Sequence, residues 1–293
     1  MTIFNFFTKF IALFLFSASV IFVTSTYLSR NTDNNSEWTY LFNGKDLDGW
    51  EMKIAGFEFN NNYRNTFSVK NGSIRVSYDN YTSFDEKFGH LFYTNKKFKN
   101  YHLKLDYRFY GEHVNLFKNE SEAWNYKNSG VMLHSEHPSQ MFLDQGFPVS
   151  IEGQFLGGSG INSRPTLNMC SPGTEVDING FQATEHCVNS TSGTIHTDDW
   201  VSVEFIVFSD SIVHHIIEKD TVMSYSNIRY GGTYLSDNFI NKIGEPLIQG
   251  FTRSFRQEFK VSPLPLDKLN TTQLKKLPNR RVEWLKPIMF SGG

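Results

Sequence analysis

Residues 148–155 alternate polar and apolar side chains in a way that could place two reactive groups on one surface. In an extended strand, successive side chains point to opposite faces. Ile151 and Phe155 would therefore share one face, and Glu152 and Gln154 would share the other. A carboxylate and an amide two positions apart on a polar face could bind a ligand and move a proton.

His134 lies near the end of a second segment of this kind, at residues 129–135. The same count sends its apolar neighbours to the core and His134 to the opposite face. If both strands belong to one sheet, His134, Glu152 and Gln154 meet at one polar pocket. Sugar hydroxyls are recognised by such paired donors and acceptors, while a carboxylate or an imidazole can transfer a proton. An ordinary solvated sheet face explains the same pattern and stays the alternative.

Four further residues are candidates for a ligand site. His196 stands in a loop at the entrance to a strand, where functional residues are common, so it is a candidate catalytic group. Gln249 and Arg253 lie in a late polar run and could contact substrate, although an ion pair within that run explains it equally well. Trp124 could supply a stacking surface, or it could simply pack the insertion at residues 113–126.

Short alternating segments separated by turn residues fill the middle of the chain, which predicts β-strands. Asn71-Gly72 between two such segments predicts a hairpin. No segment of the mature chain keeps apolar residues at helical spacing for three turns, so the expected fold class is all-β, an antiparallel sandwich. The strands are expected at 66–69, 74–78, 101–110, 129–135, 148–155, 200–208, 212–218 and 221–225.

The chain begins with an export pattern: Lys9 precedes an apolar run at residues 10–23, which small polar residues follow. This is typical of a secretory signal peptide, expected at residues 1–25. An uncleaved anchor is the alternative, and only then would a membrane be a partner. Residues 26–37 would be a flexible leader, residues 38–266 a single sandwich domain, and residues 267–293 a polar, basic tail.

Two cysteines, Cys170 and Cys187, are the only ones in the sequence. In an exported chain such a pair predicts a disulfide. Two free thiols, or half of a metal site with His186, are the alternatives.

The charges are mixed, with a formal net charge of −2. No basic stripe provides the field that a nucleic-acid partner needs, so we expect none. Aromatic residues make up 16% of the chain. They favour strands and also provide flat faces on which sugar rings can stack.

Residues 41–50, Leu-Phe-Asn-Gly-Lys-Asp-Leu-Asp-Gly-Trp, resemble the opening of the 3-keto-disaccharide hydrolase domain, also called DUF1080 or the 3-keto-glucoside lyase/hydratase domain. The resemblance covers residues 41–266. It continues through residues 128–134, 150–158, 170–174 and 186–190.

The resemblance implies a concanavalin A-like jelly roll in an exported bacterial protein that acts on glycosides oxidised at sugar carbon 3. A ketone there acidifies the C2 proton, so a general base can remove it and the glycosidic oxygen can leave by elimination. A divalent ion could stabilise the resulting enediolate, with His134 and Glu152 as ligands or as acid and base. Near the last strand, residues 250–256 lack a Glu and a His that the family commonly shows. A non-catalytic, lectin-like carbohydrate-binding module is therefore the alternative.

Overall fold

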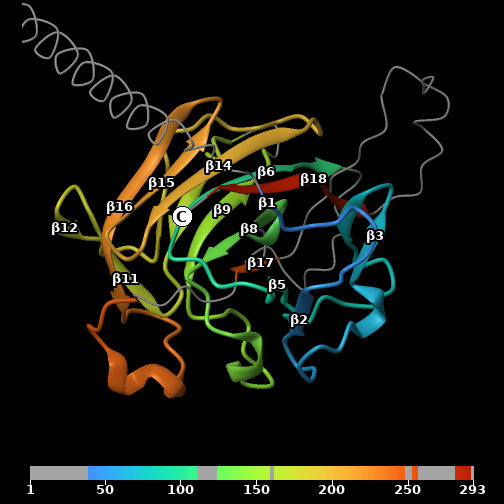
Figure 1. Cartoon of the computed structure of the whole chain (residues 1–293), viewed down its shortest axis with the longest axis horizontal. Coiled ribbons are helices and arrows are strands. Elements are labelled where there is room, and N and C mark those ends of the chain that lie inside the picture. Colours follow the sequence, from blue (N-terminus) through green and yellow to red (C-terminus); the bar gives the residue numbers. More distant parts are fainter. Residues whose placement is uncertain (1–38, 111–123, 159–161, 248–252, 257–280, 292–293) are drawn as a thin grey trace, which may run out of the picture. The chain divides into compact units, whose positions relative to one another are not determined.

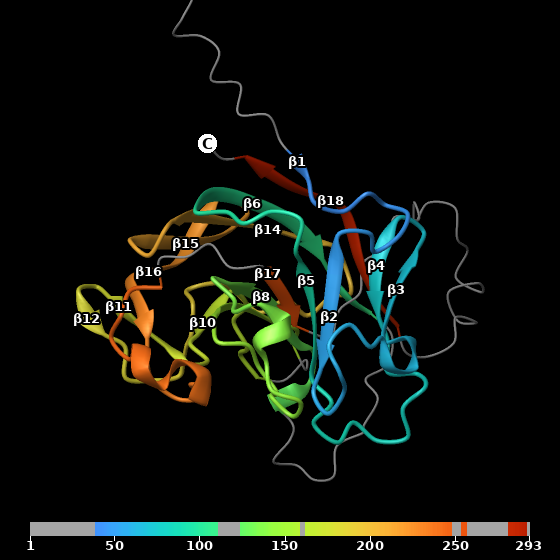
Figure 2. The same ribbon diagram turned by 60° about the horizontal axis from the view of Figure 1, so that its bottom comes forward.

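The computed structural model describes residues 39–110, 124–158, 162–247, 253–256 and 281–291. Within these residues the regular structure is mostly β-strand, in two sheets whose paired strands run antiparallel (Figure 1). Figure 2 shows the sheets as two layers, with β6 and β14 in one and β8 and β17 in the other. The expected all-β antiparallel sandwich is confirmed. The short 3₁₀ helices between strands are η1 (Tyr63–Asn65), η3 (Pro138–Gln140) and η4 (Asp237–Lys242).

The larger sheet has the order β12-β11-β16-β15-β14-β6-β18-β4-β3, and β1 and β7 also pair with β18. Its strands are β1 (Thr39–Tyr40), β3 (Phe67–Lys70), β4 (Ser73–Val76), β6 (Asn100–Tyr107), β7 (Phe109–Tyr110), β11 (Thr174–Ile178), β12 (Phe181–Gln182), β14 (Val201–Phe208), β15 (Ile212–Ile217), β16 (Asp220–Tyr230) and β18 (Arg281–Ser291).

The smaller sheet has the order β13-β10-β9-β8-β17-β5-β2. Its strands are β2 (Trp50–Ile54), β5 (Gly89–Tyr93), β8 (Asn128–Leu133), β9 (Ile151–Leu156), β10 (Asn168–Cys170), β13 (Cys187–Val188) and β17 (Arg253–Arg256).

Aromatic side chains fill the space between the sheets. Phe155 of β9 stacks on Tyr107 of β6 with 4.2 Å between ring centroids, and lies 6.3 Å from Phe205 of β14. All three are buried, and full burial of one such side chain is worth about 1.5–3 kcal/mol. A Cβ at Gly153 would lie 2.3 Å from Phe205, so glycine lets this ring reach the smaller sheet.

Two local predictions are confirmed. Asn71 and Gly72 connect β3 and β4 with φ values of 52° and 75°, the left-handed pair that a type I′ hairpin needs. Cys170 and Cys187 form a disulfide between neighbouring strands β10 and β13, with 4.1 Å between their Cα atoms.

The C-terminal part differs from the expectation of a tail. Residues 281–291 form β18, which pairs with β6 and β4. The alternation of Val282 and Trp284 with charged neighbours is a strand pattern that the surrounding basic residues obscured.

Several expected features lie outside the described residues. They are the export segment 1–25, the leader 26–37, residues 113–123 of the insertion, Gln249 and residues 267–280. In the part of the chain that the structure describes, no helix has the length and apolar character needed to cross a membrane.

Candidate functional site

Glu152 and Gln154 lie on the face of the smaller sheet that is turned away from the larger one. Gly153 and Phe155, which alternate with them in β9, face the core and approach Phe205. Glu152 and Gln154 therefore emerge on the opposite side, as strand parity predicts.

The Glu152 side chain lies across Gly130 of the neighbouring strand β8. A Cβ at Gly130 would come within 2.5 Å of Glu152 Oε1 and 2.6 Å of its Cγ. Because glycine has no Cβ, the Glu152 side chain can lie across this position. Gln154 is oriented from the other side, because Asn168 donates its Nδ2 hydrogen to Gln154 Oε1 at 3.1 Å.

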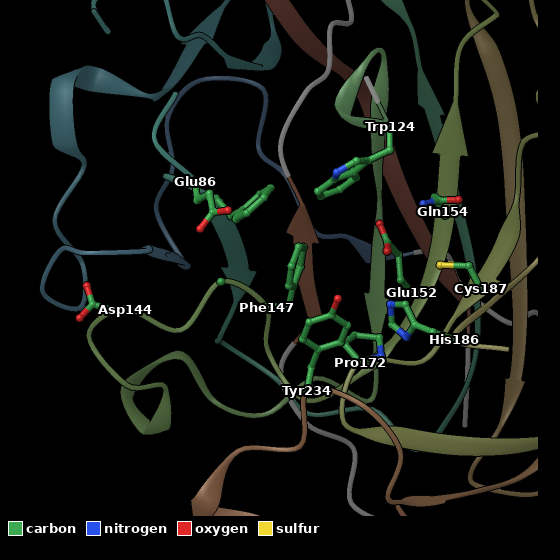
Figure 3. A pocket seen from close by; sticks show the side chains of 12 residues that line it. Glu86, Trp124, Asp144, Phe147, Glu152, Gln154, Pro172, His186, Cys187 and Tyr234 are labelled. Carbon is green, nitrogen blue, oxygen red and sulfur yellow. The ribbon is translucent and has the colours of Figure 1, made fainter. Parts of the chain in front are cut away.

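These two side chains open into a cavity of about 450 Å³, within the size range of small-ligand sites. Figure 3 shows Glu152, Gln154 and His186 on one side of the cavity and Glu86 and Asp144 on the other. The lining residues are Glu86, Phe88, Trp124, Asp144, Gly146, Phe147, Glu152, Gln154, Pro172, His186, Cys187 and Tyr234.

A chain of aromatic rings lines the same cavity as the Glu152 carboxylate. Phe88 stacks with Trp124 at 5.9 Å between centroids and lies 4.7 Å from Phe147, which in turn lies 5.9 Å from Tyr234. Trp124 is 48% exposed and Tyr234 is 61% exposed, so both present ring surface to a ligand. Flat aromatic faces next to polar groups suit the alternating C–H and hydroxyl surfaces of a sugar.

His186 reaches the cavity because the disulfide holds the chain there. Cys187, the next residue, is bonded to Cys170, whose register partner in β9 is Glu152. Ser171 also donates its backbone N–H to the His186 carbonyl at 2.9 Å. From the sequence His186 was considered only as a metal ligand, because its position near Glu152 also depends on the pairing of Cys170 with Glu152, which a sequence does not show.

Two buried residues, Lys53 and Glu136, stabilise the loop that carries Phe147 through hydrogen bonds. Lys53 donates from Nζ to the Leu143 carbonyl at 2.6 Å, and burial lowers the pKa of this ammonium. Glu136 accepts from the Val149 backbone N–H at 2.7 Å and from the Gln145 side chain, which also donates to the Phe147 carbonyl at 2.8 Å. Burial raises the pKa of Glu136 to about 7, against the opposing effect of these hydrogen bonds.

The remaining sequence candidates have different positions. His134 does not line the cavity, because β8 ends at Leu133 and His134 adopts a left-handed turn with φ of 51°, which breaks the strand alternation. His196 is exposed beside Gly158 and does not line the cavity either. Trp124 does.

Arg253 lies in β17, where its register partner in β5 is Tyr93. The β17 residue level with Met132, and through it with Glu152, is Ser254. Arg253 is thus one residue away from the row that contains Glu152.

A divalent ion does not fit the residues seen here. Among the described residues, no three His, Cys, Asp or Glu side chains are grouped closely enough to hold a metal ion. The pair His134 and Glu152 therefore gives no metal centre by itself, and the chemistry below uses none.

The chain shows distant likeness to solved structures. A Bacillus licheniformis beta-glucanase is 12% identical with a TM-score of 0.42, covering 89% of this chain and 100% of that one. Beta-agarase B from Zobellia galactanivorans is 9% identical with a TM-score of 0.43, covering 87% and 92%. A mutant alginate lyase in complex with an alginate trisaccharide is 9% identical with a TM-score of 0.40, covering 83% and 88%.

Among curated proteins, none matches this chain. Residues 37–246, most of the sequence, match the family described as the 3-keto-alpha-glucoside-1,2-lyase-like domain. The chain belongs to this family of carbohydrate-active domains.

Proposed function

We propose that this protein cleaves glycosides whose sugar ring carries a ketone at carbon 3. The observation that carries the proposal is the Glu152 carboxylate, fixed over Gly130 at one side of a cavity with aromatic walls. The ketone makes the C2 proton acidic, so one well-placed base suffices to start the reaction.

The reaction is an elimination across C1 and C2. Glu152 takes the C2 proton, the C1–O bond breaks, and the leaving oxygen receives a proton. The product is a 3-keto sugar with a C1–C2 double bond, and addition of water to it would complete a net hydrolysis.

The other cavity residues have roles that match their positions. The Gln154 amide oxygen accepts a hydrogen bond from Asn168, so the Gln154 Nε2 group is the one that can donate to the oxidised ring. His186 lies on the same side of the cavity as Glu152 (Figure 3) and can supply the proton to the leaving oxygen. The aromatic walls exclude water and stack on the ring.

The matched pair Glu152→Gln and Glu86→Gln tests this proposal on 3-keto-trehalose and a 3-keto-glucoside. Both changes replace a cavity carboxylate by an amide of the same shape, but of these two residues only Glu152 lies in a strand, β9. We expect Glu152→Gln to lower kcat by about 10²–10⁴-fold with KM little changed, and Glu86→Gln to keep activity. A substrate deuterated at C2 should show a primary isotope effect.

Three outcomes would contradict this. Sugar binding without turnover would make the chain a carbohydrate-binding module. Cleavage of an unoxidised glycoside, lost equally in Glu152→Gln and in Glu86→Gln or Asp144→Asn, would indicate the ordinary two-carboxylate mechanism. Turnover that stops with a chelator and returns with a divalent ion would require a metal.

We also propose that the protein is exported, with residues 1–25 removed. The disulfide supports this, because disulfides persist in oxidising compartments. The N-terminal sequence of the protein recovered from outside the cytoplasm should begin after about residues 19–25 of the precursor. A mature protein that keeps Met1 would favour a membrane anchor.

A further inference from the structure

A second cavity, of about 530 Å³, adjoins the first. The two share a wall, because Asp144, Gly146, Phe147 and Tyr234 line both. Figure 3 shows the Tyr234 hydroxyl pointing into the first cavity, while its ring also borders the second. A ligand whose oxidised ring occupies the first cavity can therefore extend past Phe147 and Tyr234 into the second.

Much of the second cavity is apolar and exposed. Phe142 is 46% exposed and Leu143 is 47% exposed, and both line it beside the partly buried Leu235. Large apolar side chains gathered at a hollow on the surface mark a binding site more often than isolated exposed ones do.

Few side-chain hydrogen-bond donors remain there to recognise a second sugar. The Gln145 amide is occupied, since its Nε2 donates to Glu136 and to the Phe147 carbonyl and its Oε1 accepts from the Phe142 N–H. The other polar side chains of the lining are two carboxylates, which only accept hydrogen bonds, and two hydroxyls: Asp144, Asp237, Ser236 and Tyr234. A sugar would need more paired donors and acceptors to replace its lost water.

We propose that the second cavity is the subsite for the leaving group, and that it selects an aromatic leaving group over a second sugar. This assignment rests on the proposed function, since it takes the first cavity as the site of the oxidised ring. The substrate class is then 3-keto-glycosides of aromatic alcohols.

The test compares the benzyl and methyl glycosides of 3-keto-glucose, whose alkoxide leaving groups differ mainly in the aromatic ring, together with 3-keto-trehalose. We expect the double variant Phe142→Ser, Leu143→Ser to lower kcat/KM about tenfold for the benzyl glycoside and to leave the methyl glycoside unchanged. Phe208→Ser, which removes a similarly exposed phenylalanine from β14, is the matched control and should change neither.

Equal losses for the benzyl and methyl glycosides would overturn the proposal, and so would a loss for 3-keto-trehalose as large as that for the benzyl glycoside. If no oxidised glycoside is cleaved, the proposed function fails, and calorimetric binding of unoxidised benzyl and methyl glucosides decides the subsite separately. Tighter binding of the benzyl glucoside that disappears in the double variant supports the subsite. Equal binding of the two glucosides refutes it.

Discussion

Replacing Glu136 with glutamine should stabilise the protein relative to the wild type, and this gain should be larger at neutral pH than at acid pH. Glu136 is 1% exposed, and its Oε2 has no hydrogen-bond partner among the described residues. Burial raises its pKa from 4.5 to about 7. The folded state holds the Glu136 proton more tightly than the unfolded state. The contribution of the Glu136 carboxyl to the free energy of unfolding is therefore complete below pH 4.5 and is lost as the pH rises through 7.

The loss extends over about 2.5 pH units at about 1.4 kcal/mol each, or about 3.5 kcal/mol in all. Glutamine has the shape of the protonated acid and can keep accepting from Val149 and Gln145 through its oxygen, so it removes the cost of ionisation without removing the contacts.

Urea unfolding at pH values from 4.5 to 8 measures the free-energy difference between Glu136→Gln and the wild type. We expect the difference to grow by about 3 kcal/mol in favour of the variant across this range. Glu185→Gln, at an exposed carboxylate, is the control and should give a constant difference. A difference for Glu136→Gln that does not change with pH would refute the argument.

Three further changes test other parts of the structure. Gly130→Ala would bring a Cβ within 2.5 Å of Glu152 Oε1, so we expect kcat on the 3-keto substrate to fall at least about tenfold with a stability loss of about 1–3 kcal/mol; an unchanged kcat would show that the carboxylate position does not matter. Replacing both Cys170 and Cys187 with serine should lower the free energy of unfolding by about 3 kcal/mol, measured by urea unfolding, and an unchanged midpoint would contradict this. Lys53→Met removes donors to the Ile54, Phe57 and Leu143 carbonyls and should cost about 3 kcal/mol in the same assay, whereas a neutral result would mean that the loop is held by other contacts.

Strand parity and turn chemistry predicted most of the sandwich because both act over a few residues. The alternation at residues 101–110 gives β6, with Leu103 and Leu105 buried. The Asn71-Gly72 pair gives the hairpin between β3 and β4. The β18 strand was missed because the surrounding basic residues obscured its short alternation, and because its pairing with β6 joins residues far apart in sequence, which no local pattern reports.

The same limit applies to the site. Local patterns predicted Glu152, Gln154 and Trp124 as candidate site residues, and all three line the cavity. Phe147 and Tyr234 were missed because they lie outside regular strands, where no periodicity reports which way a side chain points. His134 was misplaced because a strand end cannot be located to one residue from sequence, and one residue decides the face.

The disulfide and the strand pairing next to it explain why His186 lies near Glu152. Glu152 is paired with Cys170 in the sheet, and Cys170 with Cys187. These pairings and the disulfide place His186 within the same region as the carboxylate, although the two residues are joined by a long stretch of chain. Cysteine positions can be read directly from a sequence, whereas strand neighbours cannot, so a predicted disulfide next to a predicted polar strand is the one long-range restraint that this sequence offers. The bond thus both stabilises the fold and determines which imidazole shares the cavity with Glu152.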